Sequence, residues 1–313
     1  MPANAESIVD RDAGITRVDL AELIALRARA AKPVAFRARS SRTGGHASAV
    51  RGRGMDYAES RIYQPGDDAR NIDWRRTARS GKWHTKLFEA EREHTLLLIV
   101  DTHATMRFGT RARYKSVAAA RAAAWITWSC VRAGDRVGAM AFGAVRSAVD
   151  AHAGTRGALS VLGALARWDE LAQSAGGDVG EPLSTALARA QRLITPGGRA
   201  WLLSDGWSAD DGADQALARV ARHADLRVAI VNDALERRPV AAGTCVFETA
   251  SDKQSVDLAD ARSRAQFRER MSQGWRRLAD ACERAAIPCT VLATDDEPER
   301  AITPIWRRRA RRS

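Results

Sequence analysis

The residues best suited to chemistry in this 313-residue chain lie directly after apolar runs. Leu96 to Val100 is such a run, with the length and composition of a strand buried on both faces. Four side chains that can bind a proton, a metal ion or a partner follow it: Asp101, Thr102, His103 and Thr105. A second run, Ala200 to Leu203, ends at Ser204 and Asp205. Because open parallel sheets place their sites at the carboxyl ends of strands, we expect Asp101 and Asp205 to face one crevice.

Two carboxylates with hydroxyls nearby form a hard oxygen site, which suits Mg²⁺ or Mn²⁺. The glycine-rich loop from Ala175 to Asp178 precedes an expected helix and could add a third oxygen donor through Asp178. Mg²⁺ and Mn²⁺ are therefore the candidate cofactors that the residue types suggest.

The elements that must position these side chains alternate between strands and helices. We expect strands at residues 96–100, 137–142, 200–203, 226–231 and 289–293. This alternation predicts an α/β fold, doubly wound around a mainly parallel sheet, over residues 95–294. Three further parts are expected: an N-terminal helix with a flexible basic arm (1–53), a small β-rich module (54–94) and a basic C-terminal tail (295–313).

The small module mixes aromatic residues with many charges. One interpretation is structural: acidic side chains pair with arginines to tie the module together, namely Asp67, Asp68 and Asp73 with Arg70, Arg75 and Arg76. The other is a docking surface, since arginine and aromatic anchors dominate protein interfaces. Its candidate residues are Tyr63, Asp67, Asp68, Arg70, Asp73, Trp74 and Arg79.

Composition narrows the class of protein. No apolar run approaches the roughly 20 residues that a membrane helix needs. The first 19 residues lack the charged start and apolar core of a signal peptide. The four cysteines are scattered without ligand spacing, which favours free thiols in a reducing compartment. We therefore expect a soluble cytoplasmic protein with no membrane span.

The formal charge of +12 is concentrated in two basic stretches. They are residues 37–53 and 306–312, and both are rich in arginine. Such stretches can bind nucleic acid, and a strong fall of affinity with added salt would be the mark of it. Trp306 is the only aromatic platform beside the arginines of the tail, so a solvated surface is the favoured interpretation.

The order of these elements resembles the von Willebrand factor A domain and its metal-ion-dependent adhesion site. That family's pattern is D-x-S-x-S after the first strand, then a loop threonine, then an aspartate. The resemblance assigns these roles, in order, to Asp101, His103, Thr105, Asp178 and Asp205. Two positions depart from the pattern, and an imidazole at His103 is a poor magnesium ligand. The resemblance therefore implies a degenerate adhesion site.

The residues that precede the first strand resemble a more specific family. Residues 57–68 (YAESRIYQPGDD), 70–74 (RNIDW) and 78–81 (ARSG) resemble the hallmark of the bacterial family catalogued as domain of unknown function 58. Members of that family are usually linked to MoxR-type AAA+ ATPases. The resemblance implies a non-enzymatic adaptor that works with such an ATPase.

An enzymatic alternative is a haloacid-dehalogenase-like phosphatase, which this chain resembles in fewer respects. Asp101, Thr105, Ser204 and the pair Asp295–Asp296 imitate parts of its motifs, with His103 as the proton-transfer group. Lys253 is the only lysine between Ser204 and Asp295, and it lies in a polar region, so the spacing argues against this alternative.

Overall fold

The computed structural model describes residues 15–30, 55–90, 94–175, 180–237, 242–248 and 253–306. The chain divides into two units, one formed by Met1–Ala35 with His94–Ser313 and the other by Phe36–Glu93. Each unit is described by itself.

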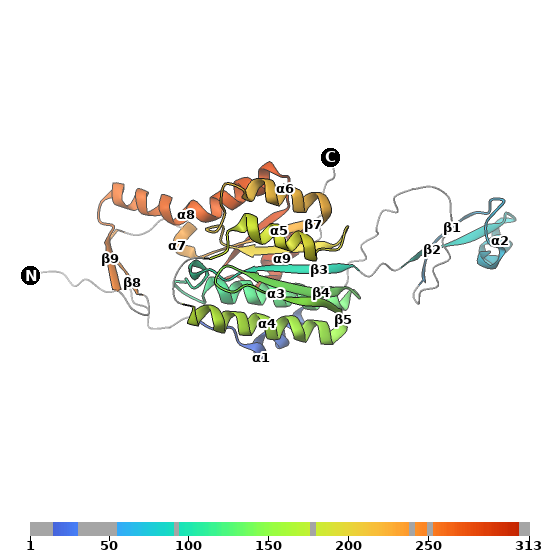
Figure 1. Ribbon diagram of the computed structural model, residues 1–313. Helices are drawn as coiled ribbons and strands as arrows, with labels where there is room; N and C mark the ends of the chain where they lie inside the picture. Colours follow the sequence, from blue (N-terminus) through green and yellow to red (C-terminus); the bar gives the residue numbers. More distant parts are fainter. Residues whose placement is uncertain are drawn as a thin grey trace, which may run out of the picture. The chain divides into compact units, whose positions relative to one another are not determined.

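The larger unit is built on one sheet, whose strands are β3 (Thr95–Asp101), β4 (Arg136–Phe142), β5 (Ser147–Ala153), β6 (Arg199–Ser204), β7 (Asp225–Asn232) and β10 (Cys289–Ala293). Their order across the sheet is β10-β7-β6-β3-β4-β5. Figure 1 labels β7, β3, β4 and β5 in that order. Every neighbouring pair is parallel except β4 and β5, which are antiparallel. The predicted α/β class with a mainly parallel sheet is confirmed.

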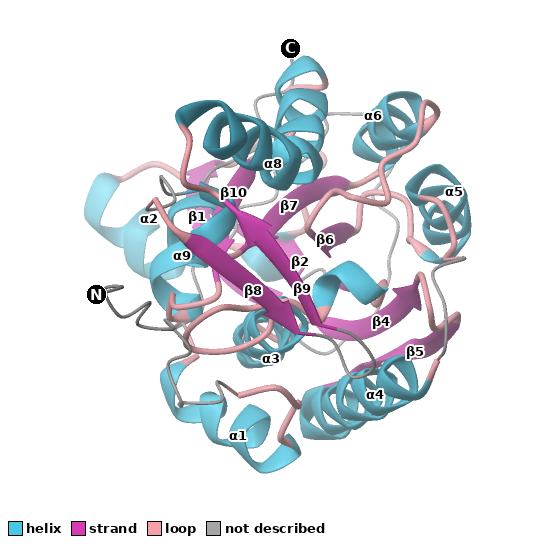
Figure 2. Ribbon diagram, turned by 90° about the vertical axis from the view of Figure 1, so that its left-hand side faces the viewer, coloured by secondary structure: helices cyan, strands magenta, loops and turns pink. Residues whose placement is uncertain are grey.

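Helices cover both faces of this sheet, as Figure 2 shows along the strands. One face carries α1 (Leu20–Ala25) with a 3₁₀ turn (Leu26–Arg29), α3 (Lys115–Arg132), α4 (Gly154–Ser174) and α9 (Pro298–Trp306). The other face carries α5 (Leu183–Leu193), α6 (Ala213–His223) and α8 (Ala261–Arg284). The short helix α7 (Ala234–Arg237) follows β7.

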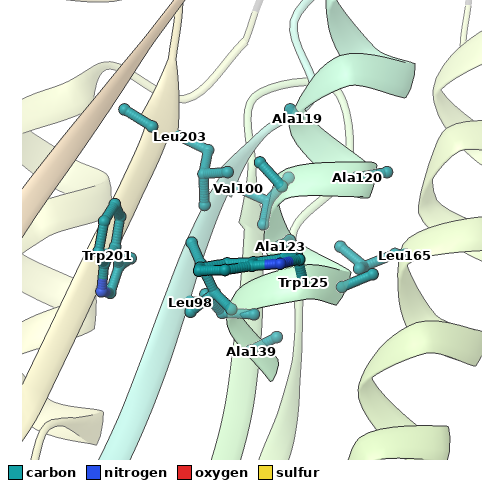
Figure 3. Packing of buried hydrophobic residues seen from close by; sticks show 14 of the residues in the cluster. Leu98, Val100, Ala119, Ala120, Ala123, Trp125, Ala139, Leu165, Trp201 and Leu203 are labelled. Atoms are coloured by element: carbon teal, nitrogen blue, oxygen red, sulfur yellow. The ribbon is translucent and has the colours of Figure 1, made fainter. Parts of the chain in front are cut away.

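Strand β3 joins the two cores because its side chains alternate between faces. Leu96, Leu98 and Val100 belong to the cluster under α3 and α4. Figure 3 shows Leu98 and Val100 between Trp125 and Trp201. The alternate residues of β3, Leu97 and Ile99, belong to the cluster under α5, α6 and α8. The apolar run that ends at Asp101 is thus buried on both sides, and its carboxylate stands at the edge of both cores.

The C-terminal residues differ from the expected tail. Residues 298–306, which the sequence analysis placed in a basic tail, form α9 and bury Ile302, Ile305 and Trp306. The Trp306 ring packs edge-on against that of Trp125, with 5.7 Å between the centroids. Arg227 donates to the carbonyl oxygens of Ile305 and Trp306. Burial against the sheet therefore orders a segment whose composition suggested a solvated tail; residues 307–313 lie outside the described residues.

The smaller unit is a two-stranded antiparallel sheet, β1 (Met55–Ile62) and β2 (His84–Ala90), joined through a 3₁₀ turn (Ala69–Asn71) and α2 (Trp74–Ser80). Asp73 caps the first turn of α2, and Gly81 ends the helix in the left-handed conformation, with a φ of 65°. A hairpin of the larger unit, β8 (Thr244–Glu248) and β9 (Lys253–Asp257), was not expected from the sequence. No helix among the described residues is long and apolar enough to cross a membrane.

Candidate functional site

Asp101 is the centre of the strand-end site, and its side chain is fully buried. Its Oδ1 accepts the backbone N–H of His103 at 3.0 Å and lies 2.6 Å from the His103 ring Nδ1. We assign the ring proton to Nδ1, because an ionised carboxylate can only accept. Its Oδ2 accepts the hydroxyls of Ser204 at 2.5 Å and Ser208 at 3.2 Å. Four donors of the chain itself therefore satisfy both oxygens of this carboxylate.

The imidazole of His103 lies between two glycines that leave room for it. A Cβ added at Gly143, which has a φ of 101°, would lie 2.6 Å from Nδ1. A Cβ added at Gly180 would lie 2.1 Å from Cδ2. The ring also packs edge-on against Phe142, with 5.7 Å between the centroids. The side chain is 11% exposed, so it fills the crevice that the resemblance assigned to a serine and an ion.

Asp205 faces a buried lysine. The Lys115 ammonium donates to Asp205 Oδ2 and Glu236 Oε1, each at 2.8 Å, and the three side chains are at most 3% exposed. Burial disfavours the charged amine, but the two carboxylates outweigh it and raise the pKa of Lys115. One ammonium does not neutralise two carboxylates, so burial raises the pKa of Glu236 despite Lys115.

The carboxylate of Asp233 extends this network beyond Glu236. Asp233 accepts the hydroxyls of Thr110 at 2.6 Å and Thr294 at 2.7 Å, and the backbone N–H of Leu235 at 3.0 Å. Its own N–H donates to Glu236 Oε2 at 2.8 Å. Burial opposes the ionisation of Asp233, but these hydrogen bonds outweigh it and lower its pKa. The network links the loop before α3 to the ends of β7 and β10.

This arrangement does not fit a divalent cation as it stands. Mg²⁺ needs open oxygen ligands, whereas four donors occupy Asp101 and Lys115 holds Asp205. Within the described ranges, no three His, Cys, Asp or Glu side chains are grouped to hold a metal. An incoming ion would have to displace several of these hydrogen bonds. Metal binding at the predicted set therefore stays a prediction.

Thr105 and Asp178 are the remaining members of that set. The hydroxyl of Thr105 is buried and has no hydrogen-bond partner among the described residues. Asp178 lies outside the described residues. A small, mainly apolar pocket opens beside Asp101 between β3, α3 and α4, and Ser116 lines it with a buried hydroxyl that has no partner in the described part of the chain. The structure thus brings Asp101 and His103 together and places Asp205 in a separate ion network.

Three acidic side chains described in the smaller unit hold its turns: Asp67 forms an ion pair, and Asp68 and Asp73 cap short helical segments. Asp67 pairs with Arg61 at 2.6 Å, and Asp68 accepts the backbone N–H of Arg70 at 2.9 Å. Asp73 accepts the Ser60 hydroxyl at 2.6 Å, which is the main cause of its lowered pKa. These bonds differ from the pairing with Arg70, Arg75 and Arg76 that the structural interpretation expected. Arg61 takes the carboxylate of Asp67, and backbone N–H groups and the Ser60 hydroxyl take those of Asp68 and Asp73. Four arginines remain exposed: Arg70, Arg75, Arg76 and Arg79.

An aromatic cluster lies beside these arginines. Trp74 and Trp83 are 65% and 56% exposed, and their ring centroids are 6.3 Å apart. The Tyr63 ring packs 5.9 Å from that of Trp83, and Ile62 next to it is 58% exposed. We call Ile62, Tyr63, Trp74 and Trp83 the aromatic cluster. It gathers three exposed large apolar side chains within one small unit, beside exposed cations.

Three residues that shape these sites could not be identified from the sequence. Lys115 opens a helix, and no local pattern marks it as the partner of a carboxylate 90 residues away. Glu236 lies in a short helix that was not expected. Trp83 directly precedes β2, and its alternation with buried His84 is the signal that it faces outward.

Comparison with known proteins identifies the family. Residues 59–277 match the family described as "Protein of unknown function DUF58". The chain belongs to this DUF58 family, as the run from residue 57 to residue 81 predicts. Uncharacterized proteins of Mycobacterium tuberculosis (strain H37Rv) and Mycobacterium bovis are 34% identical to it over 190 residues, which make up 60% of this chain and 59% of each relative. The chain therefore matches less than two thirds of the length of these curated relatives.

Two solved structures are similar to this chain at lower sequence identity. An aerotolerance-related membrane protein from Bacteroides fragilis aligns with a TM-score of 0.36 and 14% identity, over 66% of this chain and 94% of that one. An uncharacterized membrane-spanning protein from Vibrio fischeri aligns with a TM-score of 0.22 and 18% identity, over 61% and 95%. Neither likeness is strong enough to support an argument about this chain.

Proposed function

We propose that this DUF58 protein is a non-enzymatic interaction protein, an adaptor that docks a protein partner through the aromatic cluster and the arginines around it. The observation that carries the proposal is the exposure of Trp74 and Trp83, which are 65% and 56% accessible although each could bury a large apolar surface. Tryptophan, tyrosine and arginine are the residues that dominate binding energy in protein interfaces. The exposed guanidinium groups favour an acidic partner surface.

We infer further that the larger unit is a von Willebrand factor A-like domain with a degenerate adhesion site. Support comes from Asp101 at the end of a central parallel strand and from Ser204–Asp205 at the end of the neighbouring strand β6. The antiparallel edge strand β5 and the helices on both faces agree with this inference. Since the chain's own donors saturate Asp101, the adaptor would dock its partner without a bridging metal ion.

The phosphatase alternative is less well supported. A nucleophilic carboxylate needs an oxygen that can reach its substrate. Asp101 is 1% exposed, and both of its oxygens accept hydrogen bonds. The nucleic-acid alternative depends on the basic stretches at residues 37–53 and 307–312, which lie outside the described residues.

The partner that the family resemblance implies is a MoxR-type AAA+ ATPase in the same cytoplasm. The test is the affinity of the purified full chain for a purified MoxR-type ATPase of the same organism, measured by biolayer interferometry with Trp74→Ala and Trp83→Ala. Each variant should weaken binding about thirtyfold, the factor that corresponds to a loss of roughly 2 kcal/mol at a hot spot. Leu159→Ala, on α4 of the larger unit, is the control, because Leu159 is also exposed (43%).

The outcomes separate the two parts of the proposal. Unchanged affinity in both tryptophan variants would overturn the docking surface, even if the ATPase binds. Absence of any binding to the ATPase by the wild-type chain would overturn the partnership. A matched loss in Leu159→Ala would place the interface on the larger unit instead.

A further inference from the structure

Two of the four cysteines lie side by side where α8 ends and β10 begins. Both side chains pack in the core under α5, α6 and α8, and each thiol is the main cause of the shift in the other's pKa. Cys282 is fully buried in the core under α5, α6 and α8, and Cys289 packs against the same core from the first position of edge strand β10. Cys289 is partly exposed, so one thiol of the pair faces solvent while the other is held beneath it.

The end of α8 is folded so that the two residues meet. Ile287 donates its N–H to the Cys282 carbonyl at 2.8 Å, and Ala286 donates to Glu283 at 3.0 Å. This is the Schellman pattern, with Ala286 at a φ of 51° in the left-handed position that usually takes glycine. The chain reverses there and re-enters the sheet, which brings residue 289 back beside residue 282. A non-glycine residue in that conformation shows that the surrounding packing fixes the turn.

We propose that Cys282 and Cys289 are an oxidisable dithiol, which a hydroperoxide converts to an intramolecular disulfide. The Cys289 thiolate attacks one peroxide oxygen, the O–O bond breaks, and water and a sulfenic acid form. The Cys282 sulfur then attacks Cys289 Sγ, the S–O bond breaks, and the second water leaves with the Cys282 proton. The two thiols lose two electrons and two protons, and hydrogen peroxide is reduced to two molecules of water.

The electrostatics agree with this division of roles. Its interaction with the Cys282 thiol lowers the pKa of Cys289, while the same interaction and burial raise that of Cys282. The exposed partner is thus the nucleophile and the buried one resolves the sulfenic acid. Cys130, on α3, is completely buried, and burial is the main cause of its raised pKa.

The experiment treats the full-length reduced protein with a small excess of hydrogen peroxide, quenches it, and counts free thiols after denaturation. We expect two of the four thiols to be lost. Trypsin cleaves after Arg284, between the two cysteines, so the disulfide appears as two linked peptides that separate on reduction. Cys130→Ser should keep this linkage as the matched control.

Variants at Cys282 and Cys289 test which thiol reacts with peroxide and which resolves the sulfenic acid. In Cys282→Ala, the linked peptides should vanish and dimedone should trap a sulfenic acid at Cys289; in Cys289→Ser, the thiol of Cys282 should survive the treatment. The proposal is overturned if peroxide leaves all the thiols intact, if the linkage persists in Cys282→Ala, or if the wild-type protein forms only disulfides between molecules. Circular dichroism of each variant checks that it is folded.

Discussion

Replacing Lys115 with methionine tests the ion network that holds Asp205. The ammonium lies 2.8 Å from one oxygen of Asp205 and 2.8 Å from one of Glu236, with all three side chains at most 3% exposed. Methionine fills a similar volume without charge, so the change leaves two carboxylates buried without a cation. Removing one member of a buried ion pair costs about 3–5 kcal/mol, because the charge left behind has lost water as well as its partner.

The cost should depend on pH in a defined direction. Burial already raises the pKa of Glu236, and loss of the Lys115 ammonium raises it further in the folded state, so the folded variant binds more protons than the unfolded chain. The stability of Lys115→Met relative to the wild type should therefore recover as the pH falls from about 8 toward 5. In the wild type, the raised pKa of Lys115 contributes stability that persists up to about pH 10.4, the unfolded value, and is lost above it.

The assay is urea unfolding followed by tryptophan fluorescence, since Trp125, Trp128 and Trp201 are buried in the same core. Arg284→Met is the control: its ion pair with Asp214 is as short, 2.7 Å, but the side chains are 58% and 49% exposed. Such surface pairs contribute about 0–1 kcal/mol. If Lys115→Met is no less stable than Arg284→Met, the buried ammonium does not stabilise the folded chain as described. The triple variant that adds Asp205→Asn and Glu236→Gln should recover part of the loss.

Two further predictions concern neighbouring parts of the site. Gly180→Ala should lower the free energy of unfolding by about 1–3 kcal/mol, because its Cβ would lie 2.1 Å from the His103 ring. In the His103→Ala background, the same change should cost much less in urea unfolding. Additive effects of the two mutations would contradict the contact. The lowered pKa of Asp233 contributes stability above about pH 3.9 that is lost as the pH falls through its folded value. In thermal melts, the melting temperature of Asp233→Asn should therefore fall less steeply with acid than that of the wild type. Parallel falls in the two proteins would count against the network.

The position of Asp101 could be predicted because β3 is an unbroken apolar run that ends on a charge. Burial on both faces follows from that pattern, and neighbouring parallel strands place their ends together. What the pattern could not show is the direction of the side chains. Asp205 turns to Lys115, which lies 90 positions away in the sequence and has no local signal.

Tertiary burial also overrode local composition at the C-terminus. Residues 298–306 contain Pro304 and polar residues, and they precede a basic run. Their local composition therefore predicts a solvated tail. Their apolar positions repeat at helical spacing, and the side chains of Ile302, Ile305 and Trp306 complete the core against Trp125 and Arg227. The α2 helix, by contrast, carries its own start and stop signals in Asp73 and Gly81.

We propose that the chain's own donors close the strand-end site, so that the adaptor needs no bridging metal. The decisive experiment is isothermal titration of chelator-treated full-length protein with Mg²⁺, and separately with Mn²⁺, with Asp101→Ala as the control. We expect no saturable binding, and the same flat trace for the wild type and Asp101→Ala. One-site binding that disappears in Asp101→Ala would contradict it and would show that an ion displaces His103 and the serine hydroxyls from Asp101.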